Sequence, residues 1–335
     1  RRREHVLADI DAVASWTERF ARLGRLSGAE REREAAALDV AANEAANAGA
    51  VQSAIHFWQG GMRSVFLQDA NSLLARTDDL VAILGHLRAR FPQIERITTY
   101  ARSQTAADKG AEDLARLRQA GLDRIHIGME SGADRVLAFM DKGATQEIHI
   151  RAGKLVKAAG IELSEYYILG LGGREMRREH ALETAEALNR IDPDFIRVRT
   201  LSIPRSLPMA EDVREGRFTP QNDVQGAEEL LLLLENLRGT GFLVTNDHIL
   251  NLLPEATGRL PGDLPRMMEA VRWFLELSEY RQMVYRVGRR AGRIHGRADM
   301  EDARLVSWAE RLIEQEGIDA SNIDARLAKI MRGFV

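Results

Sequence analysis

The sequence predicts an α/β fold built on a parallel sheet of the barrel or doubly wound type. Between residues 64 and 201, five short strand patterns alternate with longer helical patterns, at about the minimum spacing for parallel βαβ units. Gly121 and Gly160 stand where two helical patterns end, as C-capping glycines commonly do. The chain has 335 residues, 45% of them hydrophobic, so it can bury a large core.

A local sequence pattern predicts each element of this core. Apolar residues recur at helical spacing over residues 4–23, with a polar opposite face, and an Ala-, Glu- and Arg-rich segment predicts a second helix over 29–48. The later strands are short apolar or alternating runs between turn residues. They are predicted at 64–68, 96–101, 124–128, 162–169 and 195–201, with helices over 77–90, over 111–120, from 134, over 146–159 and over 178–190.

The pattern changes after Pro204 and Pro208. A helix is predicted over about 221–238, then a short strand over 242–245, and long helices from residue 264 to the end. The sequence therefore predicts an α/β core over residues 1–205 and a mostly helical extension over 206–335.

Composition excludes several classes of protein. The 47 Lys and Arg residues against 50 Asp and Glu residues give a net charge of -3, so no global field favours nucleic acid or an anionic membrane. No apolar run approaches the roughly 20 residues of a membrane-spanning helix, and we expect a soluble, cytoplasmic protein without a membrane partner. The absence of cysteine excludes disulfides, thiolate metal sites and a cysteine nucleophile from this chain.

Polar residues gather where the predicted strands end. They are Gln68, Asp69 and Asn71 after the first strand, Thr98, Tyr100 and Arg102 on the second, Glu130 and Ser131 on the third, and Arg197 and Arg199 on one face of the fifth. Active sites of parallel barrels lie at these strand ends. Each residue alone could start a loop or cap a helix. Together, with two arginines side by side, they favour a ligand with a carboxylate or another anionic group.

Other residues have two interpretations each. Lys142 could neutralise a carboxylate, although a charge at a helix end is commoner. His126 shares a strand face with Glu130 and could donate a proton or be structural. The arginines of 281–293 could bind RNA or form a solvated helix face. The glycines after the fourth strand lack the G-x-G-x-x-G spacing of a dinucleotide site, so they favour a turn or a close approach of the backbone to a flat ligand.

Several segments in the same order resemble the radical S-adenosylmethionine (SAM) superfamily over roughly residues 60–205. They are IHIGMESG at 125–132, DRVL at 134–137, DKG at 141–143 with Thr145, AAGI at 158–161, and YILGLGG at 167–173. The resemblance is strongest to the branch of the Elongator catalytic subunit, the tRNA methylthiotransferases and oxygen-independent coproporphyrinogen oxidase. It implies an incomplete parallel (β/α) barrel that holds SAM across its strand ends.

The resemblance also implies roles for individual positions. Gln68, Asp69 and Asn71 correspond to the site of the SAM amino group, and Glu130 and Ser131 to its ribose or carboxylate. The backbone from Leu169 through Gly170 and Gly172 to Gly173 corresponds to the adenine site. Candidates for the SAM carboxylate or the substrate are Thr98, Tyr100, Arg102, Arg197 and Arg199. No residue is assigned a catalytic role or a metal by this resemblance.

The family's C-x-x-x-C-x-x-C motif, which binds a [4Fe-4S] cluster, is absent. Either a preceding segment carries it, which the start at Arg1 rather than Met favours, or the protein is a cluster-free SAM-binding, nucleoside-binding or regulatory relative. With the cluster, the family cleaves SAM reductively to an adenosyl radical, which implies a reductant such as flavodoxin or ferredoxin. The substrate, a small molecule or RNA, stays open. A third interpretation, a barrel lyase with Glu130 as base, has no motif behind it.

Overall fold

The computed structural model describes residues 2–45 and 47–331, which divide into two compact units. The first unit comprises Arg1–His126 and Leu155–Glu162, and the second comprises Ile127–Lys154 and Leu163–Val335. The boundary passes through a strand, so packing does not follow the predicted division at residue 205, which stays a prediction.

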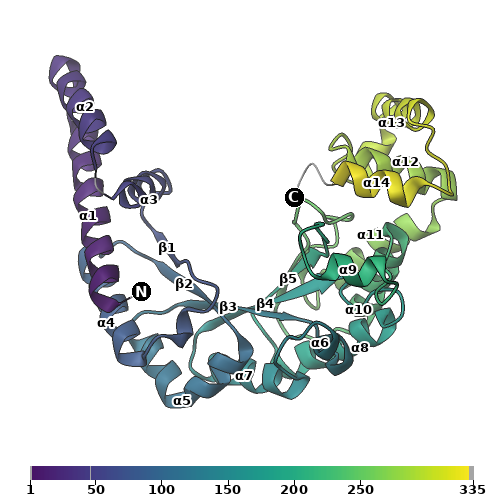
Figure 1. The fold of residues 1–335 in the computed structure, drawn as a ribbon, viewed down its shortest axis with the longest axis horizontal. Coiled ribbons are helices and arrows are strands. Elements are labelled where there is room, and N and C mark those ends of the chain that lie inside the picture. Colours follow the sequence, from purple (N-terminus) through teal and green to yellow (C-terminus); the bar gives the residue numbers. More distant parts are fainter. Residues whose placement is uncertain (1, 46, 332–335) are drawn as a thin grey trace. The chain divides into compact units, whose positions relative to one another are not determined.

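The first unit contains a parallel pair of strands and their neighbouring helices (Figure 1). Helix α1 packs on α3 and α4, and β1 pairs in parallel with β2, with Val65 opposite Ile97 and Phe66 opposite Thr98. Its elements are α1 (Arg3–Arg25), α2 (Gly28–Asn43), α3 (Ala48–Gln59), β1 (Ser64–Leu67), η1 (Ser72–Leu74), α4 (Thr77–Arg90), β2 (Arg96–Ala101) and α5 (Ser103–Gln119).

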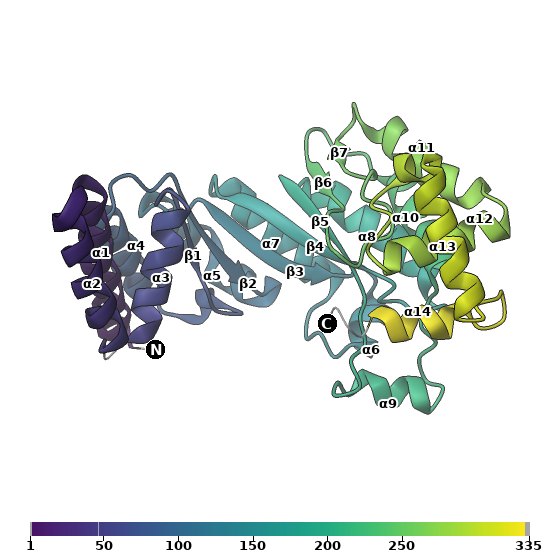
Figure 2. The same ribbon diagram turned by 90° about the horizontal axis from the view of Figure 1, so that it is seen from above.

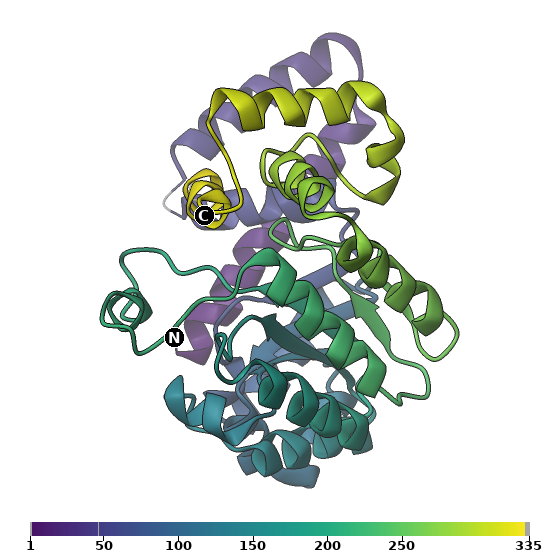
Figure 3. The ribbon, with the colours of Figure 1, turned by 90° about the vertical axis from the view of Figure 1, so that its right-hand side faces the viewer.

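The second unit contains the later strands and the C-terminal helices. In Figure 2, α8 and α10 lie side by side near β4 and β5, and Figures 2 and 3 show the yellow C-terminal helices packed together. Strand β3 (Arg124–Glu130) leads into this unit. The other elements are α6 (Asp134–Phe139), α7 (Gln146–Ala158), β4 (Glu162–Leu169), α8 (Arg177–Ile191), β5 (Phe195–Thr200), α9 (Met209–Arg214), α10 (Asp223–Asn236), β6 (Leu243–Thr245), β7 (Gly258–Arg259), α11 (Leu264–Glu276), α12 (Glu279–Arg290), η2 (Arg297–Glu301), α13 (Ala303–Gln315) and α14 (Ile323–Met331).

The strands keep chain order in the sheet, from β1 to β7. Strands β4, β5 and β6 are parallel neighbours, and β7 returns antiparallel to β6. The order is linear, so the predicted α/β class with an incomplete, mostly parallel sheet is confirmed.

Alternation on β4 and β5 sets which side chains can form a site. Tyr167, Ile196 and Val198 lie on one face and are fully buried. The other face carries Tyr166, Arg197 and Arg199, and these three are only half-buried. In a parallel strand pair, residues that are opposite in register share a face, so this second face offers polar groups to a ligand.

Some predicted boundaries were wrong. The helix predicted over 29–48 ends earlier, at Asn43, and a helix that was not predicted, α3, follows it. The Asn47 side chain caps α3 by accepting a hydrogen bond from Ala50 N; residue 46 lies outside the described residues. The helix predicted from 111 follows Gly110, whose φ of 71° separates it from a further helical segment, not predicted, that begins at Ser103. Over the described ranges, no helix is long and apolar enough to cross a membrane. The cytoplasmic location stays a prediction.

Candidate functional site

In the first unit, Asn71 joins the end of β1 to the start of α5. Its Nδ2 donates to Thr105 Oγ1 at 2.8 Å, and its Oδ1 accepts from the Arg102 backbone N–H at 3.1 Å. Asp69 Oδ1 accepts from Asn71 N at 3.4 Å. The Asn71 amide is therefore used at both ends to hold the strand ends together, whereas the side chains of Gln68 and Arg102 are exposed.

An aromatic group lies on the same unit's strands. Phe66 lies 4.7 Å from Tyr100 and 5.7 Å from His126, measured between ring centroids, and the rings of Phe66 and His126 are stacked. Phe66 is 36% exposed, unusual for a phenylalanine on a strand. Thr98, opposite Phe66 in the register, is buried. Phe66 was not predicted as a site residue. Its only signal in the sequence is that an aromatic residue stands opposite the polar positions of the next strand.

In the second unit, Glu130 ends β3 in a left-handed conformation, with φ 66°. Its Oε1 lies 2.5 Å from Lys142 Nζ, and both side chains are partly exposed. A Cβ at position 128 would lie 2.9 Å from the same oxygen, so glycine leaves room for this pair. Of the two interpretations of Lys142, the structure therefore supports neutralisation of a carboxylate. The partner carboxylate is that of Glu130, which is paired with Lys142 in this arrangement.

Ser131, expected to face SAM, is fully buried in a different network. His180 Nε2 is 3.1 Å from the Ile168 carbonyl, which can only accept, so Nε2 carries the proton. Nδ1 then accepts from the Ser131 hydroxyl at 2.8 Å, and the same Oγ accepts from Ala133 N. Burial lowers the pKa of His180, which keeps it neutral. The contact of Ser131 with SAM stays a prediction, while this hydroxyl has partners within the protein.

Glu229 on α10 is a buried carboxylate that was not predicted from the sequence. One oxygen accepts from the Tyr167 hydroxyl at 2.7 Å and from Gly170 N at 2.9 Å, and the other from Gln221 Nε2 at 2.5 Å. Burial, with Glu229 nearby, raises the pKa of Tyr167 well above its ordinary value. Glu229 therefore holds the glycine turn after β4 in place through its hydrogen bond with Gly170 N.

Two glycines of this turn are required by geometry. Gly170 has φ 91°, a conformation that other residues rarely adopt. A Cβ at Gly172 would lie 2.9 Å from both His180 Cβ and the Met176 carbonyl oxygen. The glycine run therefore allows close packing of the turn on α8. Leu169, which precedes it, is almost fully buried.

Arg197 and Arg199 stand beside each other on β5, each held by a neighbour. Arg197 Nε donates to Ser164 Oγ at 3.2 Å. The Arg199 guanidinium lies 5.4 Å from the centre of the Tyr166 ring and 3.4 Å from Asp247 Oδ1. Both arginines stay half-buried, so their remaining N–H groups can bind a carboxylate.

Glu165 lies on the opposite face of β4 and is fully buried. Burial raises the pKa of Glu165 well above its ordinary value, against the smaller opposing effects of the Met129 backbone and Lys142. Burial therefore favours the neutral form of this carboxyl group over the carboxylate.

The structure brings some predicted residues together within each unit, namely Asn71 with Arg102 and Arg197 with Arg199. The convergence of all the strand ends on one ligand stays a prediction. No group of three His, Asp or Glu side chains suited to a metal ion occurs within residues 2–45 and 47–331. The chain has no cysteine, so its side chains do not fit a thiolate-bound iron–sulfur cluster.

Comparisons with known proteins agree on one superfamily. Residues 40–188 match the Radical SAM superfamily. A tRNA uridine(34) acetyltransferase of Methanocaldococcus jannaschii is 22% identical over 121 residues, which are 36% of this chain and 22% of that protein. The chain thus spans about a fifth of the length of this curated relative.

Solved structures resemble the chain in part. Elp3 of Methanocaldococcus infernus, with its N-terminus deleted, superposes with a TM-score of 0.44 at 13% identity, over 59% of this chain and 52% of that one. The methyltransferase TsrM of Kitasatospora setae gives 0.38 at 17% identity, over 50% of this chain and 31% of that one. Methylornithine synthase gives 0.37 at 15% identity, over 51% and 47%. The similarity to this superfamily therefore rests on the match over residues 40–188 rather than on these partial superpositions.

Proposed function

We propose that this chain, whose residues 40–188 match the Radical SAM superfamily, binds SAM on the half-buried face of β4 and β5. The observation that carries the proposal is the arginine pair on β5. A free amino acid carboxylate needs charged N–H donors with fixed geometry, and two adjacent guanidinium groups provide them.

Each side chain of this face has a proposed task. Arg197 and Arg199 bind the SAM carboxylate, Ser164 and Tyr166 orient them, and Asp247 limits their excess positive charge. Glu229 holds the turn at Gly170, beside which the family places adenine.

Calorimetric titration of the chain with SAM tests this proposal. We expect Arg199→Ala to weaken SAM binding by about tenfold or more, because a charged hydrogen bond contributes about 1.5–3 kcal/mol. Arg272→Ala is the matched control, since Arg272 on α11 makes a surface pair with Glu235 and should leave the affinity unchanged. Equal affinities for all three proteins would contradict the assignment of the arginines.

The cluster chemistry of the family requires ligands that this chain does not contain. We therefore derive no step through a cluster from its residues. Anaerobic reconstitution of the full-length gene product with iron and sulfide, followed by assay for 5′-deoxyadenosine, tests whether the whole protein cleaves SAM reductively. A cluster signal with that product supports the radical enzyme. SAM binding without either supports the second candidate, a cluster-free SAM-binding protein.

A reductant such as flavodoxin or ferredoxin and the nature of the substrate remain part of the proposal. The archaeal relative's name makes tRNA one candidate substrate. The predicted basic stretch gives this little support, because three of its five arginines bond to the protein itself. Arg286 and Arg290 pair with Asp223, and Arg289 donates to the Asn251 and Leu252 carbonyl oxygens. Neither the RNA-binding nor the solvated interpretation describes these three residues, and a small-molecule substrate is favoured.

A further inference from the structure

A cavity of about 1080 Å³ lies within the second unit. It is bounded by the ends of β4 and β5, the segment after β5, the start of α10, and helices α12 and α14. Its size is at the upper end of the range for small-molecule sites, roughly 300–1,000 Å³. The cavity begins at Leu169 and Gly170, at the C-terminal end of β4.

One part of the cavity wall is apolar. Most of these residues come from the segment after β5 and from the C-terminal helices. They include Leu201, Ile203, Pro204, Val213, Leu252 and Leu327. A ligand that fills this part would need a hydrocarbon or ring body to gain from burial.

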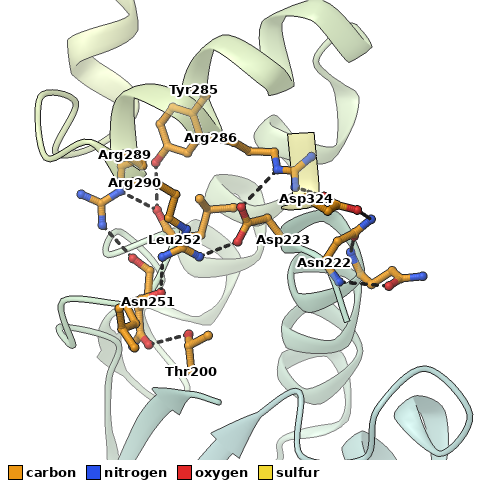
Figure 4. A network of polar contacts seen from close by, with 12 residues as sticks. Thr200, Asn222, Asp223, Asn251, Leu252, Tyr285, Arg286, Arg289, Arg290 and Asp324 are labelled. Atoms are coloured by element: carbon orange, nitrogen blue, oxygen red, sulfur yellow. Dashed lines mark hydrogen bonds and ion pairs between the residues drawn. The ribbon is translucent and has the colours of Figure 1, made fainter. Parts of the chain in front are cut away.

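A second part is built from buried charges, shown in Figure 4. Asp223, at the start of α10, pairs with Arg286 at 3.1 Å and with Arg290, and Arg286 also pairs with Asp324. Arg286 and Arg290 are 6% and 5% exposed. The Nε of Arg290 has no hydrogen-bond partner among the described residues. The wall therefore keeps a buried cationic donor beyond those used to bind Asp223.

The remaining charges on the wall are all positive. Arg174, Arg205 and Arg214 border the cavity, and none of the three forms a described ion pair with a carboxylate. Among the described residues, five arginines and two aspartates line the cavity, an excess of three positive charges. A concave, partly apolar surface concentrates this field, so it favours an anion over a neutral or cationic ligand.

We propose that this cavity binds a small amphipathic anion, in which an apolar body lies against the segment after β5 and a phosphate or carboxylate group contacts the arginines. Taking this ligand as the substrate rests on the proposed function, in which SAM lies beside the turn at Gly170, a residue that also lines the cavity. Binding itself requires neither SAM nor a reductant, so it can be measured separately.

Calorimetry with hexyl phosphate, hexanoate, hexanol and inorganic phosphate tests the ligand chemistry. Hexyl phosphate or hexanoate should bind at least tenfold more tightly than hexanol and than inorganic phosphate. Only these two probes have both an apolar chain for the apolar part of the wall and an anionic group for the arginines. The tighter of the two identifies phosphate or carboxylate as the preferred group. Equal binding of hexanol, or no binding of either amphipathic probe, would overturn the proposal.

Substitutions of residues that line the cavity test whether the probe binds there. Arg205→Glu combined with Arg214→Glu should weaken binding of the preferred probe by tenfold or more. Arg311→Glu on α13, an exposed arginine outside the cavity, is the charge control and should change the affinity less than twofold. Ala210→Trp, which places a large side chain in the cavity from the partly exposed helix α9, should also weaken binding. An equal loss in Arg311→Glu would show only a general charge effect and would overturn the site.

Titration of the probe with SAM present separates this cavity from the SAM face. If the two sites are distinct, saturating SAM leaves the affinity for the probe unchanged or raises it. Competition between SAM and the probe would overturn a separate site and assign the cavity to SAM. Failure of SAM to bind at all would contradict the proposed function alone.

Discussion

Ser131, His180 and Glu229 lie behind β4, fully buried, and their polar atoms bond to neighbouring backbone or side chains. On β5, Arg197 and Arg199 lie half-buried, and each has only one or two partners for its several N–H donors. We refer to the first three residues as the β4 network and to the two arginines as the β5 pair. Polar residues near strand ends thus serve two purposes. The first group determines where the backbone lies, and only the second is available to a ligand.

The strongest test of this contrast is Glu229→Ala. The change leaves the Tyr167 hydroxyl and Gly170 N–H buried without an acceptor, so we expect it to lower the free energy of unfolding by about 3–5 kcal/mol. Urea denaturation measures it. Glu228→Ala is the control, because the neighbouring Glu228 makes an exposed pair with Arg177, and should cost less than about 1 kcal/mol. Similar losses in the two variants would show that the β4 network has no special role.

A smaller effect distinguishes structure from binding at Ser131. Ser131→Ala removes the donor to His180 Nδ1 and the acceptor for Ala133 N. We expect a loss of about 1–3 kcal/mol in unfolding free energy, with SAM affinity changed less than twofold. Arg199→Ala should show the reverse, weaker SAM binding at nearly unchanged stability. A large loss of SAM affinity in a folded Ser131→Ala variant would restore Ser131 as a ligand contact.

This contrast marks the limit of what sequence could predict. The limits of strands 96–101 and 162–169 were predicted correctly, because alternation and turn residues are local signals. The β5 pair was predicted as well, since its spacing of two places both side chains on one face. The role of Ser131 depends on His180, 49 residues away, and that of Gly170 on Glu229, 59 residues away. Such distant partners leave no local pattern.

The role of Glu229 could not be predicted from the sequence either. It belongs to the run EELLLLLEN over 228–236, and Glu228 beside it is exposed whereas Glu229 is buried. Nothing in the composition of the run separates the two. Only the rotation of α10 against α8 and β4 decides which carboxylate faces the Gly170 turn. The candidate site was therefore predictable as a set of polar strand ends, and its division into network and ligand face was not.

Lowering the pH should reduce the contribution of the β4 network to the free energy of unfolding, by less than the substitutions above. Burial lowers the pKa of His180 below its ordinary 6.5, so near pH 6 the folded protein binds fewer protons than the unfolded chain. Its contribution to stability is complete well above pH 6.5 and is lost as the pH falls below that value. His149, with a pKa lowered to about 4, adds a similar dependence. The measurement is therefore the difference in pH dependence of unfolding between the native chain and His180→Gln, and equal dependences would contradict a neutral His180.

A still weaker effect concerns the aromatic support of the β5 pair. Tyr166→Leu keeps an apolar side chain of related size but removes the ring on which the Arg199 guanidinium lies. A cation–π contact at a partly exposed site contributes about 0.5–1 kcal/mol, so SAM binding should weaken by roughly two- to fivefold. The stability should change little, because Tyr166 is not part of the buried face of β4. Titration of Tyr166→Leu in the Arg199→Ala background completes a double-mutant cycle, in which the second change should have no further effect if Tyr166 acts by orienting Arg199. Additive losses would mean instead that Tyr166 contacts SAM itself.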